Sequence, residues 1–274
     1  LEVASKSDVI IAALGESAEM SGESSSRAHI NIPQAQKHLL RSLLKTGKPV
    51  VLVLFTGRPL VLTEESKTVP AILNVWFPGS EAGLSIADVL FGEVNPSGKL
   101  TVTFPHDVGQ IPIYYNHKNT GRPMTVENCV FEKFHSNYLD VCNSPLYPFG
   151  FGLSYTTFNI SKPSQSTDSI EGKETLTIKV DVTNTGKYDG SDVLQLYIHQ
   201  KVRSITPPVK ELKKFKKVFI KKGETKTITF HLDTSDLMFY NKDLKYVYEP
   251  GEFEFFVNDS SDGNFTNDFT VDLI

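Results

Sequence analysis

The sequence predicts an α/β domain with a largely parallel sheet, followed by an all-β sandwich, and two observations support this fold class. From Val9 to about Phe91, apolar runs of strand length alternate with segments of helical periodicity, which is typical of βαβ units. Beyond Phe158 the helical periodicity ends, and roughly seven short alternating segments separated by turn residues follow, as in immunoglobulin or fibronectin type III sandwiches. The chain therefore divides near residue 160.

Three apolar runs make up the predicted parallel sheet of the first domain. They are Val9–Leu14, Val50–Phe55 and Ala71–Phe77, which have the length of buried strands and are too short to span a membrane. A short helical segment, Leu1–Ser7, leads into the first of them. The chain starts without Met and without a charged-then-apolar leader, which indicates a fragment or a processed piece.

Two helices are predicted between these strands and after them. The first begins at Pro33 and ends near Gly47, which stands where a helix end favours a positive φ. Its apolar residues follow helical spacing: Ala35, Leu39, Leu40, Leu43 and Leu44. The second runs through Ala87 to Leu90, with Ser80 as the predicted N-cap and Gly92 closing it.

The segment 93–150 is rich in Pro, Gly, Asn and aromatic residues, and we predict one strand in it, Leu100–Phe104. The irregular stretch from His106 to Pro148 is long for a compact domain, and such loops are usually functional or lie against a neighbour. Its Cys129 and Cys142 are too few for a four-ligand zinc site. A disulfide, worth roughly 3 kcal/mol, is expected in an oxidising compartment, and free thiols otherwise.

The strands of the second domain are separated by turn signals at 184–186, 207–208, 222–224 and 249–251. The predicted strands are Thr175–Thr183, Asp192–His199, Lys213–Ile220, Lys226–Leu232, Tyr246–Tyr248 and Glu252–Val257. The polar, Ser-rich stretch Lys162–Lys173 is either the linker between the domains or the first edge of the sandwich.

Composition excludes two classes of partner. The chain is 39% hydrophobic and 22% charged, so it can bury a core, and its formal net charge of −4 provides no basic field for nucleic acid or an anionic membrane. We therefore predict no nucleic-acid partner and no membrane association, and a neutral ligand is the default. Three glycosylation triplets, at Asn159, Asn258 and Asn264, are compatible with a secretory route but carry little weight.

The polar loop after the first strand is the main candidate for a functional site. It contains Glu16, Glu19 and Glu23, with Gly22 for backbone freedom and Arg27 nearby. Ligands of parallel sheets gather beyond the carboxyl ends of the strands, and neighbouring carboxylates can shift one another's pKa. From these residues alone, however, a solvated charged loop is the favoured interpretation.

No other group of residues forms a recognisable site. The sequence lacks a Gly-x-Ser-x-Gly elbow, a phosphate-binding loop, a His-Glu-x-x-His motif and a Cys-x-x-Cys pair. For His29, a surface or packing role is favoured over a catalytic one. For Trp76, packing is favoured over sugar stacking. For Arg58, a structural ion pair or carbonyl contact is favoured over a ligand contact. We predict no metal and no cofactor.

Many motifs in the same order resemble the C-terminal portion of glycoside hydrolase family 3, in particular its periplasmic β-glucosidase branch. The matching stretches are Met20–Arg27, Asn31–Gln34, Lys48–Pro59, Trp76–Gly79, Ala87–Gly92, Asn95–Leu100, Asn119–Pro123, Leu146–Phe158, Val182–Gly186 and Leu212–Phe215. The resemblance implies an αβα sandwich domain over residues 1–158 and a fibronectin type III-like β-sandwich over residues 159–274.

The resemblance also implies a reaction. In this family a preceding (β/α)₈ barrel supplies the aspartate nucleophile of a retaining exo-β-glycosidase that hydrolyses terminal β-D-glucosyl residues. The acid/base glutamate lies in the motif before Ser-Ser-Arg, which maps onto Glu23, with Glu19 as the fallback candidate. The sequence has no nucleophile motif of this kind, so we expect the chain to be inactive unless a (β/α)₈ barrel joins it in cis or in trans.

Further expectations follow from the same resemblance. The substrate is a β-glucoside or an oligosaccharide, and the location is secreted, periplasmic or lysosomal. Substrate-binding residues are not predicted, because the barrel normally supplies them. Phe134 and Tyr138 could contact the barrel or the substrate, although packing within their own loop is favoured. The alternative function is that of a non-catalytic carbohydrate- or protein-binding remnant of such an enzyme.

Overall fold

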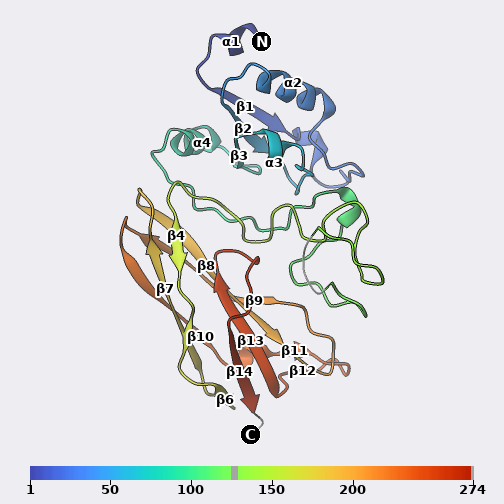
Figure 1. Ribbon diagram of the computed structural model, residues 1–274, viewed down its shortest axis with the longest axis vertical. Helices are drawn as coiled ribbons and strands as arrows, with labels where there is room; N and C mark the ends of the chain where they lie inside the picture. Colours follow the sequence, from blue (N-terminus) through green and yellow to red (C-terminus); the bar gives the residue numbers. More distant parts are fainter. Residues whose placement is uncertain (125–128, 273–274) are drawn as a thin grey trace.

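The computed structural model describes residues 1–124 and 129–272. Figure 1 shows two parts stacked along the long axis of the molecule, with the N-terminus at one end and the C-terminus at the other. The first part is a parallel sheet with helices, and the second is an antiparallel β-sandwich. A long irregular segment, drawn in green, runs between them. The predicted fold class, an α/β domain followed by an all-β domain, is confirmed.

The first sheet has the strand order β1-β2-β3, and all its pairs are parallel. Its strands are β1 (Ile10–Gly15), β2 (Val50–Phe55) and β3 (Ala71–Asn74). The three predicted strands are therefore present. The third ends at Asn74 and not at Phe77, because the backbone leaves the extended conformation at Trp76, whose φ is +53°.

Within the described residues, four α-helices accompany this sheet: α1 (Glu2–Ser5), α2 (Gln34–Leu44), α3 (Glu65–Thr68) and α4 (Ala82–Leu90). For α2 the predicted ends are confirmed, since Pro33 is its N-cap and Gly47 has a φ of +74°. For α4 the predicted N-cap was wrong. Its N-cap is Glu81 and no side-chain oxygen caps the helix, so Ser80 lies outside it.

The core of the first part lies between β1, β2 and α2. The even-numbered residues of β1 and β2 point to one side of the sheet, where they are buried together with Leu40 of α2. Leu60, Leu62 and Phe104 belong to the same cluster. Each fully buried Leu side chain contributes about 1.5–3 kcal/mol of transfer free energy. This packing fixes the carboxyl edge of the sheet.

The segment between the two parts has little regular structure, and the strand predicted over Leu100–Phe104 is wrong. Leu100 N–H donates to Phe151 O (2.8 Å) and Phe104 N–H to Tyr147 O (2.9 Å), but no continuous ladder joins these points. The apolar side chains nevertheless pack on the core, with Leu100 and Val102 partly buried and Phe104 only 1% exposed. Cys129 and Cys142 are joined by a disulfide.

The second part consists of two larger sheets, with strand orders β10-β7-β4 and β6-β14-β13-β8-β9, and a two-stranded ribbon. The strands are β4 (Phe158–Ile160), β5 (Ser164–Gln165), β6 (Ser169–Glu171), β7 (Leu176–Asn184), β8 (Gly190–Gln200), β9 (Glu211–Ile220), β10 (Thr225–Leu232), β11 (Phe239–Tyr240), β12 (Tyr246–Val247), β13 (Gly251–Asn258) and β14 (Asn267–Asp272). All six predicted strands are present, with ends shifted by at most two residues.

Polar and aromatic contacts join the two parts. Lys99 Nζ lies 3.0 Å from Asp192 Oδ1 and 3.3 Å from Asp259 Oδ2, both in the sandwich. Tyr115 stacks on Phe149 and meets the fully buried Tyr197 of β8 edge-on. Among the described residues, no helix combines the length and the apolar character needed to cross a membrane.

Candidate active site

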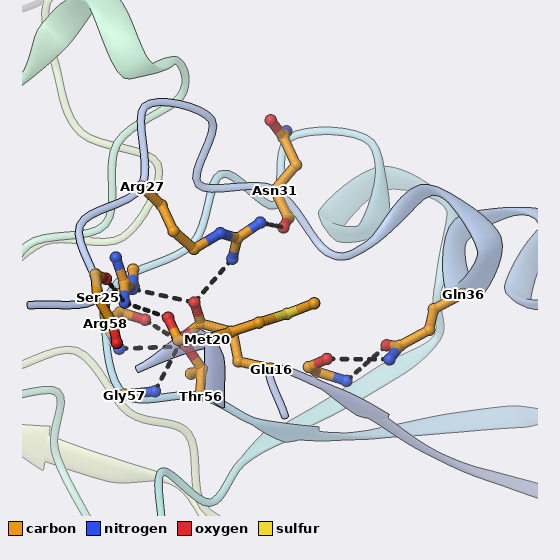
Figure 2. Close-up of polar contacts among 10 residues, drawn as sticks. Glu16, Met20, Ser25, Arg27, Asn31, Gln36, Thr56, Gly57 and Arg58 are labelled. Carbon is orange, nitrogen blue, oxygen red and sulfur yellow. Dashed lines mark hydrogen bonds and ion pairs between the residues drawn. The ribbon is translucent and has the colours of Figure 1, made fainter. Parts of the chain in front are cut away.

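The acidic loop begins where β1 ends, at the carboxyl edge of the parallel sheet. Gly15 is required there, because a Cβ atom at this position would lie 1.8 Å from the carbonyl oxygen of Phe55. Gln36 of α2 holds the same residue through both halves of its side-chain amide, accepting from Gly15 N–H (2.7 Å) and donating to Gly15 O (3.0 Å) (Figure 2). The loop therefore leaves the sheet from a fixed point.

Glu16 is the centre of the polar network in this loop (Figure 2). Its side chain is fully buried, with Oε1 lying 2.7 Å from Arg27 Nη1 and 3.0 Å from Arg58 Nε. Oε2 accepts from the Thr56 hydroxyl (2.8 Å) and from Gly57 N–H (3.1 Å). One carboxylate thus faces two guanidinium groups.

The pKa of Glu16 reflects two opposing effects. Burial raises the pKa, but hydrogen bonds from Arg27, Thr56 and the Gly57 backbone, together with the charge of Arg58, outweigh burial and hold it below its ordinary value. Glu16 is therefore ionised in the folded protein, where it neutralises part of the positive charge of the arginines. A buried carboxylate with this many donors is a structural anchor.

Glu23 lies at the tip of a tight turn. Ser25 N–H donates to Gly22 O (3.2 Å), and Ser24 has a φ of +59°, a conformation that usually requires glycine. Glu23 is exposed, and its carboxylate has no hydrogen bond or ion pair within the described residues. Glu19, in the short 3₁₀ helix η1 (Ala18–Met20), is exposed as well.

The side chain of Arg58 contacts the backbone of this turn. Its Nη2 donates to Met20 O (2.5 Å) and to Ser25 O (3.0 Å), while its Nε faces Glu16. The predicted structural role of this residue, as an ion-pair and carbonyl-binding side chain, is confirmed. Arg27 acts similarly at the end of the loop, where its Nη2 donates to Asn31 O (2.9 Å).

The remaining candidates lie around this network. Trp76 is half-buried and packs at 5.8 Å from the ring of Phe104, which confirms the predicted packing role. His29 is exposed and lines a shallow pocket of about 400 Å³ with Arg27 and Lys37. Among the residues that the structure describes, no three His, Cys, Asp or Glu side chains are grouped as metal ligands. That no metal is needed stays a prediction.

Sequence reasoning missed the burial of Glu16. A signal for it was present, since Glu16 directly follows the apolar run of β1, and a residue in that position lies next to the neighbouring strand end. The loop therefore contains two kinds of carboxylate. Glu16 is buried and paired, whereas Glu23 is exposed on the turn.

The arrangement of these domains matches two known family profiles. Residues 1–155 match the glycosyl hydrolase family 3 C-terminal domain, and residues 192–261 match the fibronectin type III-like domain. The two matches occur in this order along the chain, with a carboxylate-bearing loop at the carboxyl edge of the first domain's sheet. The chain therefore has the domain organisation of the C-terminal part of a glycoside hydrolase. The chain belongs to glycosyl hydrolase family 3.

Characterised relatives are similar over nearly the whole chain. The periplasmic beta-glucosidase of Salmonella typhimurium is 49% identical over 257 residues, which cover 94% of this chain and 33% of the relative. A beta-xylosidase of Formosa agariphila is 42% identical, covering 95% of this chain and 35% of the relative. The chain thus spans about a third of the length of the relatives it matches.

Solved structures agree with this assignment. The beta-glucosidase of Listeria innocua, in complex with gluconolactone, has a TM-score of 0.93 and 44% sequence identity. The match covers 98% of this chain and 37% of the Listeria chain. The beta-glucosidase of Kluyveromyces marxianus in complex with glucose has a TM-score of 0.80 and 30% identity, with 99% and 32% of the two chains covered.

Proposed function

We propose that the chain is part of a retaining exo-β-glycosidase that hydrolyses terminal β-D-glucosyl residues, and that Glu23 is its acid/base. The observation that carries this proposal is the position of Glu23 at the tip of a turn beyond the carboxyl edge of the sheet, where ligands of such sheets bind. The names of the relatives, beta-glucosidases and a beta-xylosidase, support the reaction class.

The proposed reaction has two steps. In the first, the Glu23 carboxyl gives its proton to the glycosidic oxygen, while an aspartate on a (β/α)₈ barrel attacks the anomeric carbon and displaces the alcohol. In the second, the Glu23 carboxylate takes a proton from a water molecule, which cleaves the glycosyl-enzyme and regenerates both carboxyl groups. Retention requires the two carboxyl groups to lie about 5–5.5 Å apart. The barrel joins this chain in cis or in trans.

One feature favours Glu23 over Glu19. Carbonyl groups on both sides of Glu23, those of Met20 and Ser25, accept from Arg58, so the turn is held at two points. Glu19 lies before this turn, outside the segment between the two contacts. The carboxyl group of an acid/base acts in both steps of each catalytic cycle, so it must take up the same position each time. This favours Glu23, whose turn is held on both sides.

We also propose the extent and the location of the domains. Residues 1–158 form the αβα domain and residues 159–274 form the fibronectin type III-like domain. The Cys129–Cys142 disulfide and the periplasmic relative support a secreted, periplasmic or lysosomal location, because disulfides persist in oxidising compartments.

The test is hydrolysis of an aryl β-glucoside by the chain, with and without an added family 3 barrel domain. We expect activity only with the barrel, a loss of at least about a hundredfold in Glu23→Gln, and little change in Glu19→Gln. Full activity of Glu23→Gln would refute the assignment. Glycan binding by the chain alone, unchanged by Glu23→Gln, would favour the alternative of a non-catalytic carbohydrate-binding remnant.

A further inference from the structure

We propose that Arg58 is the positioning residue of Glu23, because it fixes both ends of the turn that carries this glutamate. Arg58 touches neither the Glu23 carboxylate nor any reacting atom, so it acts through the loop backbone. The inference rests on the proposed role of Glu23, and it adds a residue outside the acidic loop to the machinery of acid/base catalysis.

Arg58 itself is held by the sheet. It lies just beyond the end of β2 at Phe55, and its backbone N–H donates to the Thr56 hydroxyl oxygen (3.2 Å), which in turn donates to Glu16. Its side chain is four-fifths buried, and Nε lies 3.0 Å from the fully buried Glu16 carboxylate. The group that reaches the turn is therefore attached to the end of the central strand of the parallel sheet.

From this fixed point, one nitrogen restrains the turn on both sides. Nη2 donates to Met20 O, three residues before Glu23, and to Ser25 O, two residues after it. Within the turn, Ser25 N–H donates to Gly22 O and the Ser25 hydroxyl donates to Glu23 O (3.4 Å), and both of these bonds are local to the turn. The two contacts of Arg58 are the ones that tie both sides of the tip to the end of β2 (Figure 2).

The turn needs such a restraint, because its conformation is unfavourable for its sequence. Ser24, next to Glu23, has a φ of +59°, a left-handed conformation that non-glycine residues adopt only where their surroundings hold them. Released from Arg58, the segment would relax toward ordinary backbone angles. The direction of the Glu23 side chain would change with it.

Lysine cannot replace arginine in this role. The planar guanidinium points several N–H groups at fixed angles, so one side chain reaches a carboxylate and two carbonyl groups together. The ammonium of lysine is a point donor on a flexible stem, and it would keep the charge beside Glu16 but not the three contacts. Neutralising Glu16 is not the main task of Arg58, since Arg27 already faces the same oxygen at 2.7 Å.

The first experiment measures hydrogen exchange of backbone amides in the chain alone. Arg58→Lys should speed exchange in residues 18–27 by about tenfold or more, a local opening, while peptides from β2 and the sandwich keep their protection. Arg41→Lys is the matched control, because Arg41 makes a bidentate contact with Glu64 on the outside of α2 and does not touch the loop. Unchanged exchange in residues 18–27 of Arg58→Lys would overturn the proposal.

The second experiment uses the chain joined to a family 3 barrel and compares two substrates. An acid catalyst matters most for leaving groups that need a proton, so Arg58→Lys should lower kcat/KM for a β-linked disaccharide by about a hundredfold, and much less for a nitrophenyl β-glucoside. An equal loss on both substrates indicates a general structural role and overturns the proposal.

Glu23→Gln, measured in parallel, separates the two hypotheses. If Glu23→Gln lacks this leaving-group dependence, the proposed acid/base role of Glu23 fails, while the exchange experiment still decides whether Arg58 holds the turn. If Glu23→Gln has the dependence and Arg58→Lys does not, Glu23 keeps its role and the positioning role of Arg58 is refuted.

Discussion

At the scale of single residues, the loop is organised by one buried carboxylate. Glu16 accepts hydrogen bonds from the Arg27 guanidinium, a hydroxyl and a backbone N–H, and it forms an ion pair with Arg58, so its four contacts connect the loop with the end of β2. Burying a charge is costly unless its hydrogen bonds are satisfied, and removing one partner leaves the others uncompensated. Glu16 is therefore the residue whose loss should disturb the site most.

Replacing Glu16 by Gln should destabilise the protein. The substitution leaves Arg27 and Arg58 close together without a counter-charge, and breaking a buried ion pair in this way costs about 3–5 kcal/mol of the free energy of unfolding. Urea denaturation measures this change. Glu2→Gln is the control, because the Glu2–Lys6 pair is exposed and its loss should leave the midpoint almost unchanged. Equal midpoints for Glu16→Gln and wild type would contradict the prediction.

The same residue should make stability depend on acid pH. The folded-state pKa of Glu16 is below its ordinary value of 4.5, so its ionised form stabilises the folded protein above that pH. This contribution is lost as the pH falls from about 4.5 through the folded-state pKa. Glu16→Gln should therefore lose less stability between pH 6 and pH 3 than wild type does. Parallel pH profiles of the unfolding midpoint would refute this assignment.

The partners of Arg58 could not be predicted from sequence, although its kind of role could. Gly57-Arg58-Pro59 after a predicted strand favours a structural contact, but the accepting carbonyl groups lie 38 and 33 positions earlier in the chain. Which carbonyl groups point at the guanidinium depends on the turn at Gly22–Ser25. That turn contains a left-handed serine, for which the sequence has no signal.

At the scale of elements, periodicity predicted burial better than it predicted strand pairing. Val50–Phe55 is β2, with the predicted bounds, because a continuous apolar run between two covered faces has few alternatives. Leu100–Phe104 packs on the core at every second residue, as a strand would, but its described backbone bonds to the segment 146–151 are confined to its two ends. The strand β14 was missed because only Phe269 and Val271 are apolar in it.

The long segment between the domains is held by a buried glutamine. Gln110 Oε1 accepts from His106 N–H (2.6 Å), and its Nε2 donates to Cys142 O (2.7 Å) and Ser144 O (3.3 Å), so it joins the beginning of this segment to the C-terminal end of the disulfide-bonded loop. The hydrogen bonds of this side chain hold the irregular segment in the way that backbone hydrogen bonds hold paired strands. It therefore fixes the base of the loop that contains Phe134 and Tyr138.

Gln110→Ala should loosen this loop. The substitution leaves buried backbone groups without partners, which costs about 1–3 kcal/mol, and it frees the segment from 106 to 144. Limited proteolysis should cut this segment faster in the variant, and urea should unfold the variant earlier. Gln34→Ala, on the exposed side of α2, is the control and should change neither quantity. Unchanged cleavage of Gln110→Ala would show that the disulfide alone holds the loop.

At the scale of the whole molecule, the two domains are connected by a buried charge. Asp192 of β8 is 3% exposed, and Lys99 from the first domain lies 3.0 Å from its Oδ1. Lys99 also donates to Gly152 O (3.1 Å) and faces Asp259. The sequence predicted both domains, but it could not predict this contact, because the two residues lie far apart in the chain and each resembles an ordinary surface charge.

Lys99→Met should separate the unfolding of the two domains. Removing the lysine leaves Asp192 as a buried charge without its cation. This destabilises the interface between the domains by about 3–5 kcal/mol. A single calorimetric transition in wild type should become two, or one broadened transition at lower temperature. The double variant Lys99→Met with Asp192→Asn should recover part of the loss, because it no longer buries an unpaired charge. If the double variant is no more stable than Lys99→Met, the lysine acts by packing its stem against the sandwich and not by compensating Asp192.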